Sequence, residues 1–287
     1  MLYVVNYADG EPYESFRRAN TKTALLFGGA DKVFEYSSEN IPSEYKHKYS
    51  KIFTYKRGAG LWLWKPYIIL DALSKIKDND WLFYCDSGAV FIDNLRKMVS
   101  CAIENHTDIL LVEQPMLNRQ FCKRESFIRM NVTDSSENQL LSGYILLQKS
   151  EWSLKFIQEW QKWCEVEEII SPNHFDSDVV EWPDFYSHRE DQSILTLLSI
   201  KYGLVPFRDP SDYGLMPYMY SSPDWRYCPK KYPNSTYPTI VLCSRTINPL
   251  IYAIKFFFKR ILIKLGIYYT EKQVLKKRGV TYENCNI

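Results

Sequence analysis

The chain has 287 residues, of which 46% are hydrophobic and 24% charged, values that favour one large globular domain with a small appendage. Its formal net charge of +2 is unevenly distributed, because residues 246–287 carry eight Lys or Arg and two Glu, or +6, which leaves −4 for residues 1–245. A mildly acidic body argues against nucleic acid as the main substrate, since a nucleic-acid-binding domain carries a basic stripe across its folded part.

Cysteine usage and the N-terminus predict a cytoplasmic protein. The cysteines, at positions 85, 101, 122, 164, 228, 243 and 285, form no Cys-x-x-Cys pair, a pattern typical of reduced thiols. The chain opens on MLYVVNYADG, a strand pattern with no basic segment before an apolar run, so no signal peptide is predicted. No uninterrupted apolar stretch reaches about 18 residues, so no membrane-spanning helix is expected.

The first 55 residues read as the start of a parallel sheet. Residues 2–6 form an apolar strand pattern, residues 14–27 a helix that stops at Gly28-Gly29, and residues 32–36 a second strand. This β-α-β order predicts an α/β fold. Residues 41–55 are polar and aromatic and predict a helix and a loop.

Residues 56–93 carry the first candidate site. A loop with Arg57 and two glycines leads to a helix that has Pro66 in its first turn, and a buried strand at residues 81–85 follows. That strand ends in Asp86-Ser87-Gly88, and ligands of open α/β sheets bind beyond the carboxyl ends of strands. Asp86 alone could equally form an Asx-turn. Arg57, Lys65 and two nearby tryptophans favour a binding site.

The middle of the chain continues the alternation of helices and strands. A helix is expected at residues 95–105, a strand at 109–113, and a solvated insertion or an acceptor-side flap at 114–137. Residues 140–148 form a strand that Ser142-Gly143 interrupts, which indicates a bulge or a close backbone approach. The aromatic stripe of the next helix, residues 151–166, predicts core packing.

A second polar cluster opens the helix expected at residues 187–202. Ser187 and Glu190 match a Ser-x-x-Glu capping box, whereas His188, Arg189, Asp191 and Gln192 share a first turn that we expect to be exposed. A helix N-terminus keeps a carboxylate ionised, and an ionised carboxylate can act as a general base. Asp191 is the first candidate for that base and Glu190 the second, because the cap would occupy Glu190.

The last third of the chain ends in a basic tail. A short strand is expected at residues 204–207, an irregular segment at 208–238, and a last strand at 240–243. Residues 247–265 place four basic side chains on one helical face and a broad apolar sector beside them. This pattern favours a helix lying in a membrane interface over a helix docked on the domain with a basic outer face.

Three stretches together resemble glycosyltransferases of the GT-A class, in particular bacterial and viral enzymes of capsule or O-antigen assembly. They are RGAGLWLWKPYIILDAL…WLFYCDSGAVF, LLSGYILLQKSEWSLKFIQEW and SHREDQSILTLLSIKYGL, in the order found in that class. The resemblance covers residues 1–245 and implies a GT-A-like domain with a mixed, mostly parallel sheet flanked by helices. Residues 246–287 would form a basic amphipathic helical tail.

The resemblance also implies roles for individual residues. The nucleotide-sugar donor, most favourably a UDP-sugar, would meet Tyr7, Asp9, Arg57, Trp62, Trp64, Lys65, Asp86, Ser87, Gly88 and Gly143, and its diphosphate would lie against Arg57, Lys65 and Arg245. The acceptor would meet Ser142, Gly143, His188, Arg189 and Gln192, with Asp191, Glu190 and Asp86 as catalytic residues.

Two departures from the class weaken the expectation of a metal. Asp86-Ser87-Gly88 lacks the second carboxylate of an Asp-x-Asp motif, and Cys243-Ser244-Arg245 stands where many members have a histidine ligand. Asp86 with a nucleotide diphosphate could still hold Mn²⁺ or Mg²⁺. Alternatively, the cations at positions 57, 65 and 245 would neutralise the leaving diphosphate without a metal.

The expected function is therefore transfer of a sugar, most simply a hexose, to a glycan or lipid-linked glycan during surface polysaccharide assembly. The enzyme would be cytoplasmic and peripheral on the inner face of a membrane, which it would meet through residues 247–280. The alternative is a non-catalytic carbohydrate- or membrane-binding protein that kept the fold and lost the chemistry. A nucleotidyltransferase is disfavoured, because Tyr7-Ala8-Asp9-Gly10 is too short for a phosphate loop.

Overall fold

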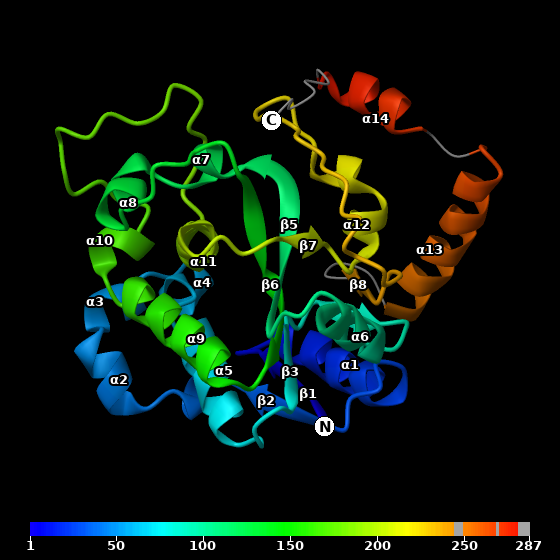
Figure 1. The fold of residues 1–287 in the computed structure, drawn as a ribbon, viewed down its shortest axis with the longest axis horizontal. Coiled ribbons are helices and arrows are strands. Elements are labelled where there is room, and N and C mark those ends of the chain that lie inside the picture. Colours follow the sequence, from blue (N-terminus) through cyan, green and yellow to red (C-terminus); the bar gives the residue numbers. More distant parts are fainter. Residues whose placement is uncertain (244–248, 268–269, 281–287) are drawn as a thin grey trace.

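A six-stranded sheet forms the centre of the computed structural model, which describes residues 1–243, 249–267 and 270–280 (Figure 1). In spatial order the strands are β2 (Lys32–Tyr36), β1 (Leu2–Tyr7), β3 (Trp81–Cys85), β6 (Asn138–Gln148), β5 (Ile109–Leu117) and β7 (Phe207–Arg208). Strand β6 runs antiparallel to β3 and β5, whereas the other neighbouring pairs are parallel. The predicted mixed, mostly parallel α/β sheet is confirmed.

Buried apolar runs explain why these segments are strands. All six side chains of β1 and all five of β3 are buried, as expected for strands with helices on both faces. The predicted opening is confirmed, since β1 and β2 pair in parallel with α1 (Tyr13–Leu26) between them. Because β1 also pairs in parallel with β3, the carboxyl ends of β1 and β3 lie at the same edge of the sheet.

Helices cover both faces of the sheet. One face carries α2 (Ser43–Lys48), α3 (Ser50–Phe53), α5 (Trp64–Ser74), α9 (Glu151–Cys164), α10 (Glu167–Ile170) and α11 (Glu190–Lys201) over one apolar core. The other carries α1, α6 (Arg96–Glu104) and the antiparallel pair of β4 (Ala89–Phe91) with β8 (Val241–Cys243) over a second core. Trp160 of α9 is fully buried, which confirms the core role of the aromatic stripe.

The segment after residue 113 differs from the solvated insertion that we expected. Strand β5 continues to Leu117, and α7 (Asn118–Phe121) and α8 (Arg124–Arg129) follow it. Asn118, Phe121 and Lys123 are fully buried. The prediction failed because the segment's many polar residues suggested solvent, whereas several of them find partners inside; Lys123 Nζ, for example, donates to the carbonyl of Asn173 at 2.5 Å.

The basic tail is docked on the body through a third apolar cluster. Helix α13 (Pro249–Lys264) contributes Phe256 to this cluster and α14 (Glu271–Arg278) contributes Leu275. They pack beside η2 (Pro217–Tyr220), which follows α12 (Asp212–Leu215). The division into units 1–245 and 246–287 stays a prediction. None of the helices described here is long and apolar enough to cross a membrane.

Candidate functional site

A left-handed turn precedes α5 in the loop around Arg57 that the sequence marks as a candidate site. Gly58, Ala59, Gly60, Leu61 and Trp62 all have positive φ, in the segment labelled α4 (Gly58–Leu61). Non-glycine residues pay about 1–2 kcal/mol each for this conformation, and such strain concentrates at functional sites. A Cβ at position 58 would lie 2.3 Å from ring carbons of Trp62, so glycine is required there. The sequence predicted a loop but not its handedness.

The turn positions two tryptophans differently. Trp64 is buried, stacks on Tyr7 with ring centroids 3.7 Å apart, and donates from its indole nitrogen to the carbonyl of Gly58 at 2.9 Å. One face of Tyr7 is therefore already covered. Trp62 is half-buried and lies under the guanidinium of Arg57, 5.5 Å from its ring centroid. Asp9, which we expected beside the nucleoside, is exposed and accepts from the Ser38 hydroxyl.

Lys65 and Asp191 form a buried ion pair in the core of the site. Lys65 Nζ lies 2.9 Å from Asp191 Oδ2 and 2.9 Å from Ser142 Oγ, and the Lys65 and Asp191 side chains are 3% and 4% exposed. Burial raises the pKa of Asp191, and the charge of Lys65 opposes that rise. The expectation that Asp191 lies in an exposed turn is wrong, because the residue is buried and paired with Lys65. The diphosphate contact of Lys65 stays a prediction.

Asp86 lies beside this pair, against the bulge in β6. The register of β6 against β5 shifts next to Gly143, and a Cβ at position 143 would lie 3.0 Å from Asp86 Oδ2. The predicted bulge and close approach are thus both present. The Tyr84 hydroxyl donates to Asp86 Oδ1 at 2.9 Å. Burial raises the pKa of Tyr84 and the charges of Asp86 and Asp191 raise it further, so all three groups share one site.

Glu190 and Arg57 close the site toward the surface. Arg57 Nε lies 2.6 Å from Glu190 Oε1, and the Arg57 side chain is 60% exposed whereas that of Glu190 is 3% exposed. Burial raises the pKa of Glu190 to about 7, although Arg57 opposes the rise. Glu190 has φ +37°, the left-handed region, at the first position of α11. A near-neutral pKa and backbone strain are both features of functional carboxylates.

The predicted capping box does not form. The N-cap of α11 is Arg189 and its side chain makes no capping hydrogen bond, while the backbone N–H of Ser187 donates to the carbonyl of Gln120 at 3.1 Å. Local sequence suggested that Glu190 turns back toward Ser187. The structure turns it toward Arg57 instead, a partner 133 positions away in the chain. Glu190 is therefore not occupied by a capping interaction, which was the reason for ranking it second as a base.

The remaining residues predicted for the acceptor are mostly buried. His188 accepts from the backbone N–H of Lys123 at 3.2 Å, and burial lowers its pKa to about 3, so it is neutral. Gln192 accepts from the Ser142 N–H and donates to Gln139. The expectation of an exposed first turn is wrong for both. Arg189 is half-buried and its guanidinium lies 4.5 Å from the ring centroid of Phe121.

Ser87, Gly88 and Arg245 are the remaining predicted site residues. Ser87 is half-buried and Gly88 buried, directly after Asp86. Arg245, predicted to meet the diphosphate, lies outside the described residues. Tyr84 was missed, although it stands two residues before Asp86, a spacing that places side chains on the same face of an extended chain. Gln139 was missed because nothing in its local sequence marks it.

A metal would find few ligands from the protein. The part of the chain that the structure describes contains no group of three or more His, Cys, Asp or Glu side chains able to hold an ion. Asp191, whose pKa is raised in part by the charge of Asp86, is paired with Lys65. Asp86 could contribute one carboxylate, and phosphate oxygens would have to supply further ligands, as Mg²⁺ commonly requires.

No protein-family model and no curated protein matches the chain. Among solved structures, the chain is similar to mouse xyloside xylosyltransferase 1 in its apo form, with 11% identity, a TM-score of 0.46, and coverage of 86% of this chain and 100% of that one. It is also similar to the galactosyltransferase LgtC in complex with donor and acceptor sugar analogs, with 16% identity, a TM-score of 0.47, and coverage of 96% and 99%.

Proposed function

We propose that the protein is a glycosyltransferase that moves a sugar from a nucleotide-diphospho-sugar to a glycan or lipid-linked glycan. The observation that carries this proposal is the meeting of four distant segments at one edge of the sheet. Asp86 after β3, Gly143 in the β6 bulge, the Lys65–Asp191 pair and the Arg57–Glu190 pair are linked by direct contacts and shared electrostatics. Strained backbone at positions 58–62 and 190 supports a functional site.

Arg57 is the best-placed cation for the diphosphate. It is the exposed member of its pair, and its guanidinium lies over the Trp62 ring. A guanidinium binds phosphate oxygens through two parallel hydrogen bonds, and positive charge placed where the leaving group gains negative charge lowers the barrier. Lys65 would act indirectly, by fixing the position of Asp191 and Ser142.

Glu190 is better placed than Asp191 to accept a proton. Its pKa of about 7 matches a general base that works near neutral pH, and its partner Arg57 reaches solvent. In the proposed reaction the acceptor hydroxyl oxygen attacks the anomeric carbon, its proton passes to the Glu190 carboxylate, and the bond to the diphosphate breaks. The nucleoside diphosphate leaves with the electron pair of that bond. Engagement of Arg57 by the diphosphate would release Glu190 for this role.

A divalent cation fits this site only in company with the nucleotide. Asp86 would hold it on the protein side, and phosphate oxygens of the nucleotide would supply the other ligands. When bound, such an ion neutralises charge on the leaving diphosphate. The chain's own contribution is the same in either case: Tyr84 orients Asp86 by donating to its Oδ1.

A panel of UDP-, GDP-, CMP- and dTDP-sugars, each with and without Mn²⁺, tests the proposal by thermal shift and by donor hydrolysis without acceptor. We expect one nucleotide, most favourably UDP, to raise the melting temperature, and its sugar to be hydrolysed slowly. Stabilisation without hydrolysis or transfer would favour the non-catalytic alternative. Absence of both effects for every nucleotide would contradict the proposal.

Helix α13 supports the further proposal of a peripheral enzyme on the cytoplasmic face of a membrane, acting in surface polysaccharide assembly. Phe256 is buried against the body, whereas neighbouring apolar side chains point to solvent: Ile254, Phe257, Phe258, Ile261 and Leu265 are between 47% and 66% exposed. The tail is docked on the body, and its outward side carries these apolar side chains beside the exposed Lys255. An exposed apolar face with basic neighbours is typical of helices in membrane interfaces.

Sedimentation with vesicles tests this setting. The protein is expected to bind vesicles that contain anionic phosphatidylglycerol more tightly than neutral phosphatidylcholine vesicles. Phe258→Glu should weaken binding at least tenfold, while Phe27→Glu, at a similarly exposed phenylalanine that ends α1, should not. Equal binding by both variants would contradict the membrane role of α13 without touching the transferase proposal.

A further inference from the structure

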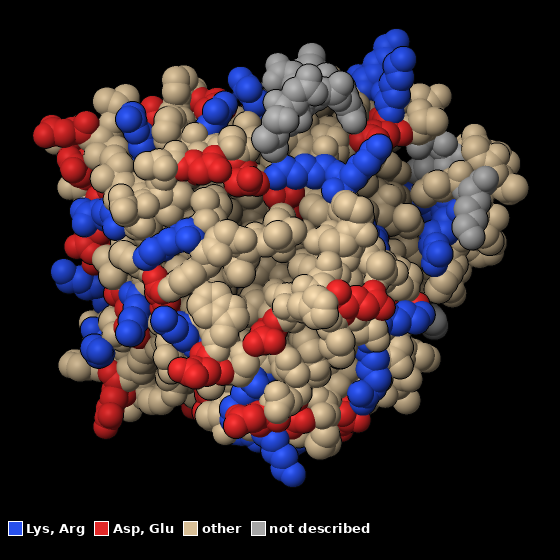
Figure 2. All heavy atoms as spheres, in the orientation of Figure 1, with Lys and Arg blue, Asp and Glu red and all other residues tan. Residues whose placement is uncertain are grey.

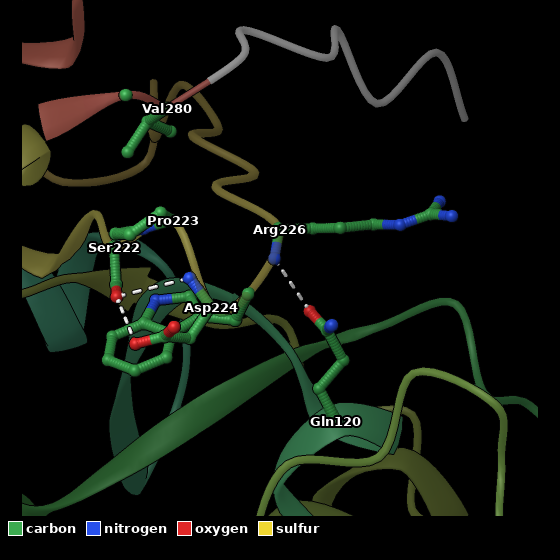
Figure 3. A pocket seen from close by; sticks show the side chains of 8 residues that line it. Gln120, Ser222, Pro223, Asp224, Arg226 and Val280 are labelled. Carbon is green, nitrogen blue, oxygen red and sulfur yellow. Dashed lines mark hydrogen bonds between the residues drawn. The ribbon is translucent and has the colours of Figure 1, made fainter.

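A cavity of about 210 Å³ lies outside the site described above, between residues 222–226, Gln120 and the end of the tail at Gly279-Val280 (Figure 3). We infer that this cavity binds one neutral sugar unit of the acceptor glycan. The identification of the sugar as part of the acceptor rests on the proposed function, whereas carbohydrate binding is argued from the cavity alone. The cavity is smaller than the roughly 300–1,000 Å³ of pockets for drug-sized ligands, so it suits one sugar ring and not a nucleotide-sugar.

The lining carries the groups that recognise a saccharide. Trp225 offers an indole that is fixed by donation from its ring nitrogen to the carbonyl of Tyr220 at 3.0 Å. An immobilised aromatic ring is an apolar face on which the C–H side of a sugar ring can pack at low entropic cost. Ser222 and Asp224 supply a hydroxyl and a carboxylate, joined by a 3.0 Å hydrogen bond, on the same side of the cavity. Vicinal sugar hydroxyls pair with such groups.

Charge selects a neutral sugar over an acidic one. Asp224 is exposed and its carboxylate lies among the lining side chains, whereas the Arg226 side chain extends away from Ser222 and Asp224 (Figure 3). Arg226 lies instead toward Asp184, with Nε 3.9 Å from Oδ2 of that carboxylate. Among the described residues, the guanidinium groups of Arg226 and Arg278 are directed at Asp184 and at the Ser221 carbonyl, so a sugar carboxylate beside Asp224 would meet a like charge, and like charges repel.

The cavity is joined to Glu190 by a short run of packed rings. Trp225 meets Phe121 edge to face with ring centroids 5.4 Å apart, and the Arg189 guanidinium lies 4.5 Å from the Phe121 ring centroid. Arg189 immediately precedes Glu190. Tyr186, 51% exposed, contacts both Phe121 and Trp225 and forms a surface between the two places. A glycan chain that occupies the cavity can therefore extend over Tyr186 toward the proposed base.

Gln120 connects the cavity lining to the segment before α11 by hydrogen bonds. Its side-chain oxygen accepts from the Arg226 N–H at 2.9 Å (Figure 3), its side-chain nitrogen donates to the carbonyl of Asp184, and its own carbonyl accepts from the N–H groups of Tyr186 and Ser187. One residue of α7 thus fixes both the cavity and the segment that leads into α11. The tail forms the opposite wall, where Arg278 donates to the carbonyl of Ser221 at 2.8 Å.

Binding of saccharides by saturation-transfer NMR tests the inference on the full chain. The probes are maltose, lactose, cellobiose and N,N′-diacetylchitobiose as neutral sugars, with methyl glucuronide as the acidic one. We expect at least one neutral disaccharide to bind and the glucuronide not to bind. Trp225→Ala should weaken that binding roughly tenfold, as expected for the loss of one aromatic contact, and Asp224→Asn severalfold.

Matched controls separate the possible failures. Phe27→Ala and Asp78→Asn remove an exposed aromatic and an exposed carboxylate elsewhere and should leave saccharide binding unchanged. Asp224 is an exposed side chain, so Asp224→Asn keeps the test valid if Trp225→Ala fails to fold. Binding that is insensitive to both cavity variants, or no binding of any neutral probe at 20 mM (about the weakest affinity such a probe would show), overturns the inference. If no donor is hydrolysed while saccharide binding still depends on the cavity residues, the transferase proposal is contradicted and the saccharide-binding inference is not.

Discussion

Replacing Glu190 by glutamine separates chemistry from folding at the proposed base. Gln keeps the shape of the side chain and can still accept from Arg57, but it cannot take a proton. Because general-base catalysis contributes about 10²–10⁴-fold, we expect kcat/KM for transfer to fall by that factor while donor affinity changes little.

Whereas the activity of Glu190→Gln should fall, its stability relative to the wild type should rise with pH. The folded-state pKa of Glu190, about 7, lies above its ordinary value of 4.5, so the protonated carboxyl stabilises the fold below pH 4.5 and this contribution is lost as pH rises through 7. A shift of this size corresponds to on the order of 3 kcal/mol. Glu190→Gln should therefore become more stable than the wild type as pH rises from 5 to 8.

Urea unfolding at several pH values tests the stability prediction, and steady-state transfer assays test the activity prediction. Glu44→Gln, at an exposed carboxylate on α2, is the control and should parallel the wild type in both measurements. Retention of full activity by Glu190→Gln would refute its role as base. Unfolding curves whose pH dependence matches the wild type would refute the buried, near-neutral carboxyl.

Three other substitutions probe the surroundings. Lys65→Met should cost about 3–5 kcal/mol, because it leaves Asp191 charged and unpaired in the core, and adding Asp191→Leu should restore most of that loss in urea unfolding. Gly143→Ala should cost only about 1 kcal/mol of stability yet lower donor affinity, since its Cβ would press on Asp86; unchanged nucleotide titrations would contradict this contact. Because the pKa of His188 is lowered to about 3, its contribution to stability should fall by roughly 2–3 kcal/mol between pH 6.5 and 4.5, so the wild type should lose that much stability relative to His188→Gln over this range in urea unfolding.

The sheet could be predicted because its strands are short apolar runs with clear ends. The strands β1, β2 and β3 and the glycine bulge of β6 were expected where they occur, since burial on both faces leaves a strong local pattern. Asp86 was recognised by its place after such a run. These features depend on neighbouring residues alone.

The ion pairs could not be predicted because their partners lie far apart in the chain. Glu190 matched a capping box with Ser187, yet the contact that decides its conformation is made with Arg57. Lys65 and Asp191 looked like surface charges, since charged residues are rarely buried unless paired, and pairing is invisible in one sequence. In the proposed mechanism Glu190 therefore takes the place of the base that the local pattern suggested for Asp191.

The surface of the molecule shows why charge alone was a weak guide. Acidic and basic side chains are interspersed over the face seen in Figure 2, and much of its centre is uncharged. The groups that matter for the proposed chemistry, Asp191 and Glu190, are both nearly inaccessible to solvent. Net charge marked the basic tail in the sequence but carried no information about the site.

A crystal structure of the protein soaked with the stabilising nucleotide-sugar tests the central claim most directly. The diphosphate should lie within hydrogen-bonding distance of Arg57, beside Asp86 and Gly143, with the Glu190 carboxylate released from its present ion pair and facing the anomeric carbon. A nucleotide bound elsewhere, with Arg57 still paired to Glu190, would contradict the assignment of this site.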